Sequence, residues 1–167
     1  MFEMYRPKLN LPKTKTEKIA DFIGNTLLVI AFAYLAVNWS SLPAEIPVHF
    51  GFNGEVDRWG SKFELLILPS IAIFLWFIMV EVEKRPHTHN YPDRLNESNV
   101  ERFYVNSRKI TNYTKNICNV LFTYIICRTI LIALGKAETL GIIPFSLIIT
   151  ALIVVIIWGL IKTVKIK

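Results

Sequence analysis

The side chains best suited to chemistry lie in one stretch, residues 41–62. His49 can change its charge near neutral pH, and Glu55 and Asp57 follow it closely. Such a group can sense pH, contact a ligand or hold a metal ion. The alternative is structural, with the His49 ring bonded to Asp57 or to a backbone carbonyl so that it pins the loop. One histidine and two acids fall short of the spacing of a zinc site, so we expect no metal and no cofactor.

The same stretch has the pattern of a small folded hairpin. Pro43 and Pro47 hold the chain extended, and apolar residues alternate after them as in a strand. Asn53-Gly54 is a strong signal for a tight turn between two strands. We therefore expect ligand or partner contacts from Pro47, His49, Asn53, Gly54, Asp57 and Lys62. For Asp57 and Lys62 the alternative is turn chemistry, with Lys62 and Trp59 anchored at headgroup level.

Two further positions place charge inside apolar sequence. Arg128 interrupts an apolar run, and a buried arginine in a membrane normally has a partner or a wet cavity. We expect Glu64 to be that partner, in an intramembrane polar pair; snorkelling to the headgroups is the alternative. Asp21 and Asn25 are four residues apart near the start of another run. They could line a polar path, but we favour an interfacial Asp21 beside Lys18.

Four long apolar stretches of the chain must form the elements that position these side chains. The 167 residues are 53% hydrophobic and 19% charged, whereas a soluble domain is about 45–50% apolar and about 25% charged. Four stretches approach the roughly 20 apolar residues that cross a bilayer: 19–39, 63–80, 117–135 and 142–161. A soluble helical bundle is the less favoured alternative. The expected fold is an all-α integral membrane protein with four transmembrane helices and a small folded extracytoplasmic loop between helices 1 and 2.

The basic residues predict the orientation. The net charge is +6, and fifteen of the 19 lysines and arginines lie in residues 1–18, 82–116 and 162–167. Positive charge concentrates on the cytoplasmic side of membrane proteins, so both termini should be cytoplasmic. This bias accounts for the charge without a nucleic-acid partner; the partner it implies is membrane lipid.

The spans divide the chain into four parts: a cytoplasmic segment 1–18, a first helix pair 19–81 that holds the loop 41–62, a cytoplasmic loop 82–116, and a second helix pair with its tail 117–167. A short amphipathic helix should follow the turn-rich start of the loop 82–116. Its apolar side chains recur at helical spacing, which suits packing against the membrane or the bundle; they are Val100, Phe103 and Tyr104.

The loop 41–62 also resembles a known family. Its string Leu42-Pro43, Ile46-Pro47, His49-Phe50, Gly54, Asp57-Arg58-Trp59 and Lys62 is similar to the signature of the domain of unknown function DUF1648. The turn Asn90-Tyr91-Pro92 with the residues after it resembles the second loop of small stand-alone members. That family occurs in bacterial integral membrane proteins, including SdpI-like immunity proteins. The resemblance implies a place in the bacterial cytoplasmic membrane and protection against a membrane-active peptide toxin, with a signalling role in some members.

Three functions follow as hypotheses. The first is SdpI-like immunity, in which the loop recognises a peptide toxin. The second is a membrane-embedded assembly or regulatory subunit that binds partner helices, and the third is a small transporter or a metal-assisted enzyme. We favour the first and expect no catalytic residues, because the sequence contains no phosphate-binding loop and no nucleophile with a positioned base. The chain could also form a homo-oligomer.

Overall fold

Four long helices and one small hairpin make up the structure, a computed structural model that describes residues 6–167. The helices are α1 (Lys15–Asn38), α2 (Ile67–Lys84), α3 (Val100–Ala133) and α4 (Ile142–Lys165). Each is long and apolar enough to cross a membrane. The expected fold class is confirmed: the chain is a multi-pass membrane protein with 69% of its residues in helices.

The hairpin lies between α1 and α2, as expected. Strand β1 (Glu45–Phe50) pairs antiparallel with β2 (Val56–Ser61). The turn between them contains Gly54 at a φ of +79°, a left-handed conformation that glycine adopts without steric cost. Short 3₁₀ turns, η1 (Trp39–Ser41) and η2 (Lys62–Leu66), join the hairpin to the two helices.

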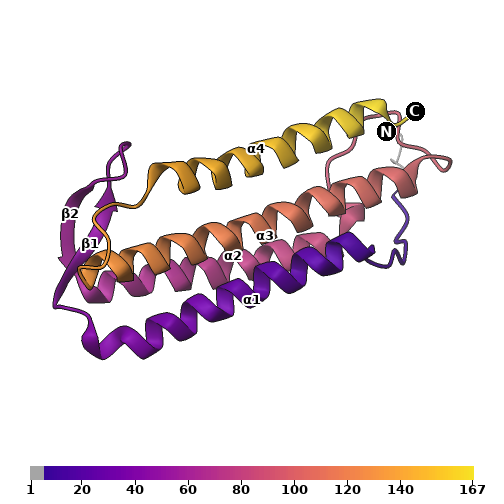
Figure 1. The fold of residues 1–167 in the computed structure, drawn as a ribbon. Helices are drawn as coiled ribbons and strands as arrows, with labels where there is room; N and C mark the ends of the chain where they lie inside the picture. The colour runs from indigo at the N-terminus through magenta and orange to yellow at the C-terminus, as the bar shows by residue number, and fades with distance from the viewer. Residues whose placement is uncertain (1–5) are drawn as a thin grey trace.

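Helix α3 is the centre of the bundle, since it packs against α1, α2, α4 and β1. Figure 1 shows it running between α4 on one side and α1 with α2 on the other, with the hairpin at one end. We call this the hairpin end; the opposite end is where α1 begins and α4 ends. An apolar core under the hairpin joins α1 and α3 to the hairpin and η2; its buried members are Ala31, Leu35, Leu42, Ile46, Leu65, Ile126 and Ile130.

The amphipathic helix expected in the loop 82–116 does not end before the third span. Residues 100–133 form one continuous helix of 34 residues, so the boundary at 116/117 falls inside α3. Polar residues at 106–119 lowered the apolar signal, but they face α1, α2 and α4 rather than ending the helix. The apolar stripe of Val100, Phe103 and Tyr104 packs against the bundle and the loop before it.

Helix α4 depends on a close approach to α3. A Cβ added to Gly159 would lie 2.2 Å from Ile110 Cγ1, so the two helices meet where glycine leaves room. The Asn106 amide adds hydrogen bonds to the Gly159 carbonyl and to Thr163 Oγ1, both at 2.9 Å.

Gly159→Ala therefore tests this contact. Helix propensity alone would favour alanine by about 1 kcal/mol, but the clash with Ile110 predicts a lower melting temperature in detergent. Ile110→Ala is the matched variant: combined with Gly159→Ala it removes the clash, so the double variant should melt above the sum of the two single effects. Strict additivity would show that the close approach does not hold α4.

Candidate functional site

The hairpin, β1 with β2 and their turn, carries the exposed polar groups predicted from sequence. His49 Nδ1 and Asp57 Oδ1 lie 2.6 Å apart across the two strands, and both side chains are exposed. Asn53 shapes the turn, because its Oδ1 accepts from the Glu55 backbone N–H and its Nδ2 donates to Glu55 Oε2. The pinning contact weighed for His49 is thus present. It leaves one ring nitrogen and the outer face of the pair open to solvent.

A groove of about 350 Å³ lies between the hairpin and the first turn of α4. Its walls are mostly apolar, with Phe50, Phe52, Leu140, Ile142 and Phe145 among the lining residues. The His49–Asp57 pair lies on its rim, and Gly54 contributes to its floor. The Phe52 side chain is fully exposed. We refer to this feature as the hairpin groove.

The loop between α3 and α4, residues 134–141, is tied to the hairpin. The Leu140 N–H donates to the Gly54 carbonyl at 2.8 Å, and a Cβ on Gly54 would touch the backbone nitrogens of Gly141 and Ile142 at 3.6 Å. The positive φ of the turn is therefore what requires glycine at 54, while its carbonyl makes the contact with the loop. The hydrogen bond joins two residues that line the hairpin groove.

The expected pair between Arg128 and Glu64 does not form. Arg128 instead donates to the carbonyls of Thr139 and Leu140, and Tyr124 donates to the carbonyls of Leu140 and Gly141. The α3–α4 loop folds back over the end of α3, so its carbonyls reach the guanidinium and supply the partner that a buried arginine needs. Arg128 thus anchors the wall of the hairpin groove.

Glu64 has a local role that explains why it does not pair with Arg128. It occupies the N3 position of a capping box with Ser61, a Ser-x-x-Glu spacing that satisfies free N–H groups at a helix start. Its Oε1 accepts from the Ser61 N–H, and its Oε2 lies 3.2 Å from Arg58 Nη1. The capping signal was available in the sequence.

Two other predicted site residues lie away from the hairpin groove. Pro47 is buried in β1 opposite Trp59 and faces a smaller cavity of about 170 Å³ beside α2 and α3. Lys62 reaches Trp39, with Nζ 3.5 Å from its carbonyl oxygen and 5.2 Å from its ring centre. Of the six predicted contact residues, His49, Gly54 and Asp57 line the hairpin groove, and Asn53 shapes the adjoining turn.

A second polar site, not predicted from the sequence, lies at the opposite end of the bundle. Lys13 Nζ lies 2.7 Å from Asp21 Oδ2 and 2.6 Å from Glu83 Oε1. Lys115 Nζ lies 2.9 Å from Asp21 Oδ1 and 2.6 Å from Glu83 Oε2. These four side chains form a closed ring of alternating charge, which we call the charge ring. It joins α1, α2, α3 and the segment before α1.

Hydrogen bonds from α3 complete the charge ring. The Asn112 amide donates to Asp21 Oδ1 at 2.8 Å and to Glu83 Oε1 at 2.9 Å, and Asn116 donates to Asp21 Oδ1 at 2.9 Å. Both Glu83 and Lys115 keep only 2% of their side chains exposed. Burial alone would lower the pKa of Lys13, but its hydrogen bonds to Asp21 and Glu83 raise it above the ordinary value. The ring therefore holds Lys13 charged.

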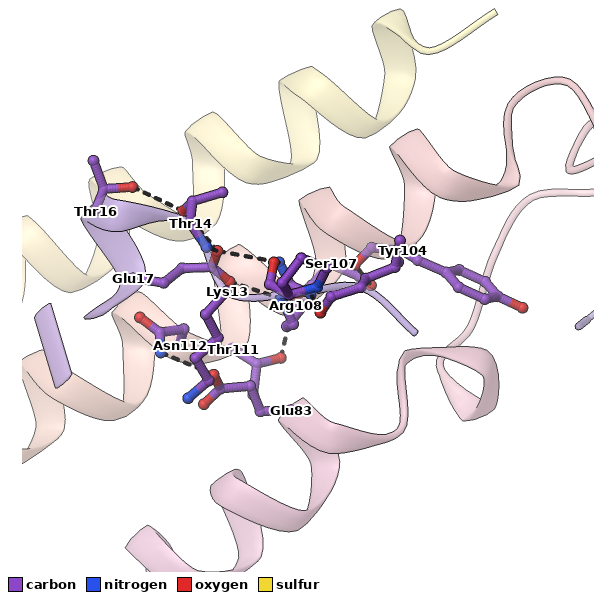
Figure 2. Close-up of polar contacts among 12 residues, drawn as sticks. Lys13, Thr14, Thr16, Glu17, Glu83, Tyr104, Ser107, Arg108, Thr111 and Asn112 are labelled. Carbon is purple, nitrogen blue, oxygen red and sulfur yellow. Dashed lines mark hydrogen bonds and ion pairs between the residues drawn. The ribbon is translucent and has the colours of Figure 1, made fainter. Parts of the chain in front are cut away.

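Arg108 and Glu17 form a neighbouring buried pair. The guanidinium donates two hydrogen bonds to the carboxylate, at 2.8 and 3.1 Å. It also donates to the carbonyls of Leu11 and Pro12. Glu17 belongs to a capping box with Thr14 at the start of α1. Figure 2 shows Arg108 and Asn112 of α3 facing Glu17 of α1 and Glu83 of α2. The partner expected for Asp21, Lys18, is wrong, because Lys13 and Lys115 bind its carboxylate; the interfacial position of Asp21 stays a prediction.

A signal for this site was present in α3. Arg108, Asn112, Lys115 and Asn119 recur at spacings of four, three and four, which places them on one face of a helix. Asn119 continues the polar face into the span, where Asn25 Oδ1 accepts from it at 3.2 Å and from Trp76 Nε1 at 2.9 Å. Within residues 6–167 no group of three histidine, cysteine or acidic side chains could hold a metal ion.

The hairpin, with parts of the helices on either side of it, matches a known family model. Residues 26–73 match the model of a family described as a domain of unknown function, DUF1648. The predicted resemblance is confirmed. The matched DUF1648 region runs from within α1, through the hairpin, into α2.

A relative extends the likeness beyond this region. An uncharacterized protein of Archaeoglobus fulgidus is 35% identical over 101 residues, which cover 59% of this chain and 54% of that protein. The match thus spans about half the length of the relative. No solved structure matches the chain.

Arg128→Gln tests the anchor of the hairpin groove. Loss of the guanidinium should free the loop carbonyls and speed amide hydrogen exchange at Leu140, whose N–H donates to the Gly54 carbonyl, by roughly tenfold, since a charged hydrogen bond contributes about 1.5–3 kcal/mol. Hydrogen exchange followed by mass spectrometry of the full-length protein measures this. Lys136→Gln, an exposed change in the same loop, is the matched control. Unchanged exchange in Arg128→Gln would contradict the anchoring role.

Proposed function

We propose that this protein protects its membrane from a cationic amphipathic peptide by binding that peptide in the hairpin groove. The observation that carries the proposal is the combination of apolar walls with acidic groups at the rim. Phe52 and Phe145 offer apolar surface, while Asp57 and Glu55 present carboxylates at the turn. Membrane-active peptides combine an apolar face with a lysine- or arginine-rich face, so the chemistry of the groove is complementary.

The position of the groove supports this proposal. It lies at one end of helices that are long enough to cross a bilayer, where a peptide lying in the membrane interface would reach it. Exposed aromatic side chains of the hairpin region, Phe52, Trp59 and Phe63, suit the same interfacial depth. The hairpin is already paired and bonded to the α3–α4 loop, which limits the ordering cost of binding.

The proposed orientation places the hairpin outside the cell. Most lysines and arginines of the described chain lie at the opposite end of the bundle, which suits a cytoplasmic location of both termini. We further propose a bacterial cytoplasmic membrane and a role like that of SdpI-like immunity proteins. The DUF1648 match supports the family part of this argument; the toxin-protection part rests on the chemistry of the groove.

Expression of the full-length protein in a sensitive bacterial host tests the proposal. The probe is a synthetic amphipathic peptide of leucine and lysine, with a scrambled peptide of the same charge as its control. We expect host survival to rise, and Asp57→Asn or His49→Ala to remove that gain because each breaks the rim of the groove. Lys136→Gln is the matched control and should protect like the parent.

Binding of the same fluorescent peptide to the purified protein in a neutral detergent separates recognition from expression effects. Asp57→Asn should weaken binding by roughly tenfold, in the range of a charged contact. Equal binding by the parent and Asp57→Asn would contradict the proposed site. Co-purification of a membrane protein, with no protection of the host, would instead favour an assembly or regulatory subunit.

A further inference from the structure

A second groove lies between α3 and α4 at the opposite end of the bundle. Its volume is about 460 Å³, and it opens between the first turns of α3 and the last turns of α4. Four of its lining side chains are basic: Arg102, Lys109, Lys162 and Lys165. Glu101 is the acidic lining residue. We call this feature the basic groove.

The basic side chains of the basic groove have no acidic side chain as a partner among the described residues. Among residues 6–167, none of its four basic side chains forms an ion pair with an aspartate or glutamate side chain, whereas Lys13, Lys84, Arg85, Arg108 and Lys115 of the same end do. Arg102 donates to the main-chain oxygen of Lys167 at 3.1 Å. The carboxylates of Glu17, Asp21 and Glu83 are committed to those partners. Four cations around one cavity repel one another unless an anion joins them.

The end of α4 does not need these lysines for capping. Lysines in a last helical turn usually serve the exposed carbonyls and the helix dipole. Here Arg94 already donates to the carbonyls of Thr163, Val164 and Ile166, at 2.8 to 3.2 Å. Lys162 and Lys165 are therefore available for another anion.

The surroundings indicate a ligand that is anionic at one end and apolar at the other. Lys162 Nζ lies 3.7 Å from the centre of the Trp158 ring, a pairing of cation and indole that suits the membrane interface. Beyond Trp158, α4 exposes apolar side chains along its length, including Val154 and Ile157. Asn106, which also lines the groove, donates to the Thr163 hydroxyl. Basic pockets between transmembrane helices are suited to phospholipid headgroups.

We propose that the basic groove binds the headgroup phosphate of an anionic phospholipid, with the acyl chains lying along α4. Arg102 and Lys109 on α3 and Lys162 and Lys165 on α4 would surround the phosphate. This site is separate from the hairpin groove, and its existence does not depend on the proposed function.

Lipid titration of the full-length protein in a neutral detergent, followed by native mass spectrometry, tests the proposal. Phosphatidylglycerol and phosphatidylcholine with identical acyl chains are the two lipid probes, and inorganic phosphate is the third. We expect phosphatidylglycerol to bind more tightly than phosphatidylcholine. The variant Lys162→Gln/Lys165→Gln should weaken phosphatidylglycerol binding by roughly 20-fold, because each lysine contributes several-fold to attraction at a membrane surface.

The matched control is Lys15→Gln/Lys18→Gln, which removes the same charge from exposed positions on α1 at the same end. It should leave phosphatidylglycerol binding within about twofold of the parent. Circular dichroism confirms that each variant is folded, and Arg102→Gln provides an independent change on α3 that should also weaken binding.

Three outcomes would overturn the proposal. Equal loss in both double variants would show that total charge, and not the basic groove, attracts the lipid. Equal binding of phosphatidylcholine would exclude selection for an anionic headgroup. Competition by millimolar inorganic phosphate as effective as that of phosphatidylglycerol would identify a site for the free anion and not for a lipid.

Discussion

The charge ring of Lys13, Asp21, Glu83 and Lys115 is the constraint on which the bundle depends. Each lysine bridges both carboxylates, and each carboxylate uses both of its oxygens. Removing one member would leave a buried charge without compensation, which costs about 3–5 kcal/mol. Because its members come from four segments, the ring is satisfied only when α1, α2 and α3 share one register.

The charge ring holds the helices together at one end of the bundle, and these helices position the hairpin and the α3–α4 loop at the other end. The helices that meet at the charge ring carry the hairpin and the α3–α4 loop at their far ends, and α3 runs the whole distance between them. There Arg128 holds the loop by its carbonyls, and the loop holds the turn through Gly54. One long helix thus positions both polar ends of the protein. A groove wall built on such an element is more precise than one built on a free loop.

The features that depend on local chemistry could be predicted from the sequence. The turn at Asn53-Gly54, the contact between His49 and Asp57 and the four apolar spans follow from short patterns. Contacts between distant segments could not be predicted. Arg128 donates to loop carbonyls, which give no side-chain signal in the sequence, and Lys13 pairs with Glu83, which lies 70 positions away. The spacing of polar residues on α3 could have revealed a buried polar face. The acidic residues that contact this face are determined by how the helices pack, which the sequence pattern does not show.

The thermal stability of Glu83→Gln in detergent, compared with that of Glu81→Gln, tests whether the charge ring holds the bundle together. Both changes remove one carboxylate from α2, but Glu83 is buried in the charge ring, whereas Glu81 pairs with Lys84 and Arg85 at the surface. We expect Glu83→Gln to lower the melting temperature by roughly 10 °C and Glu81→Gln to change it little. Equal melting temperatures for the two variants would contradict the structural role of the charge ring.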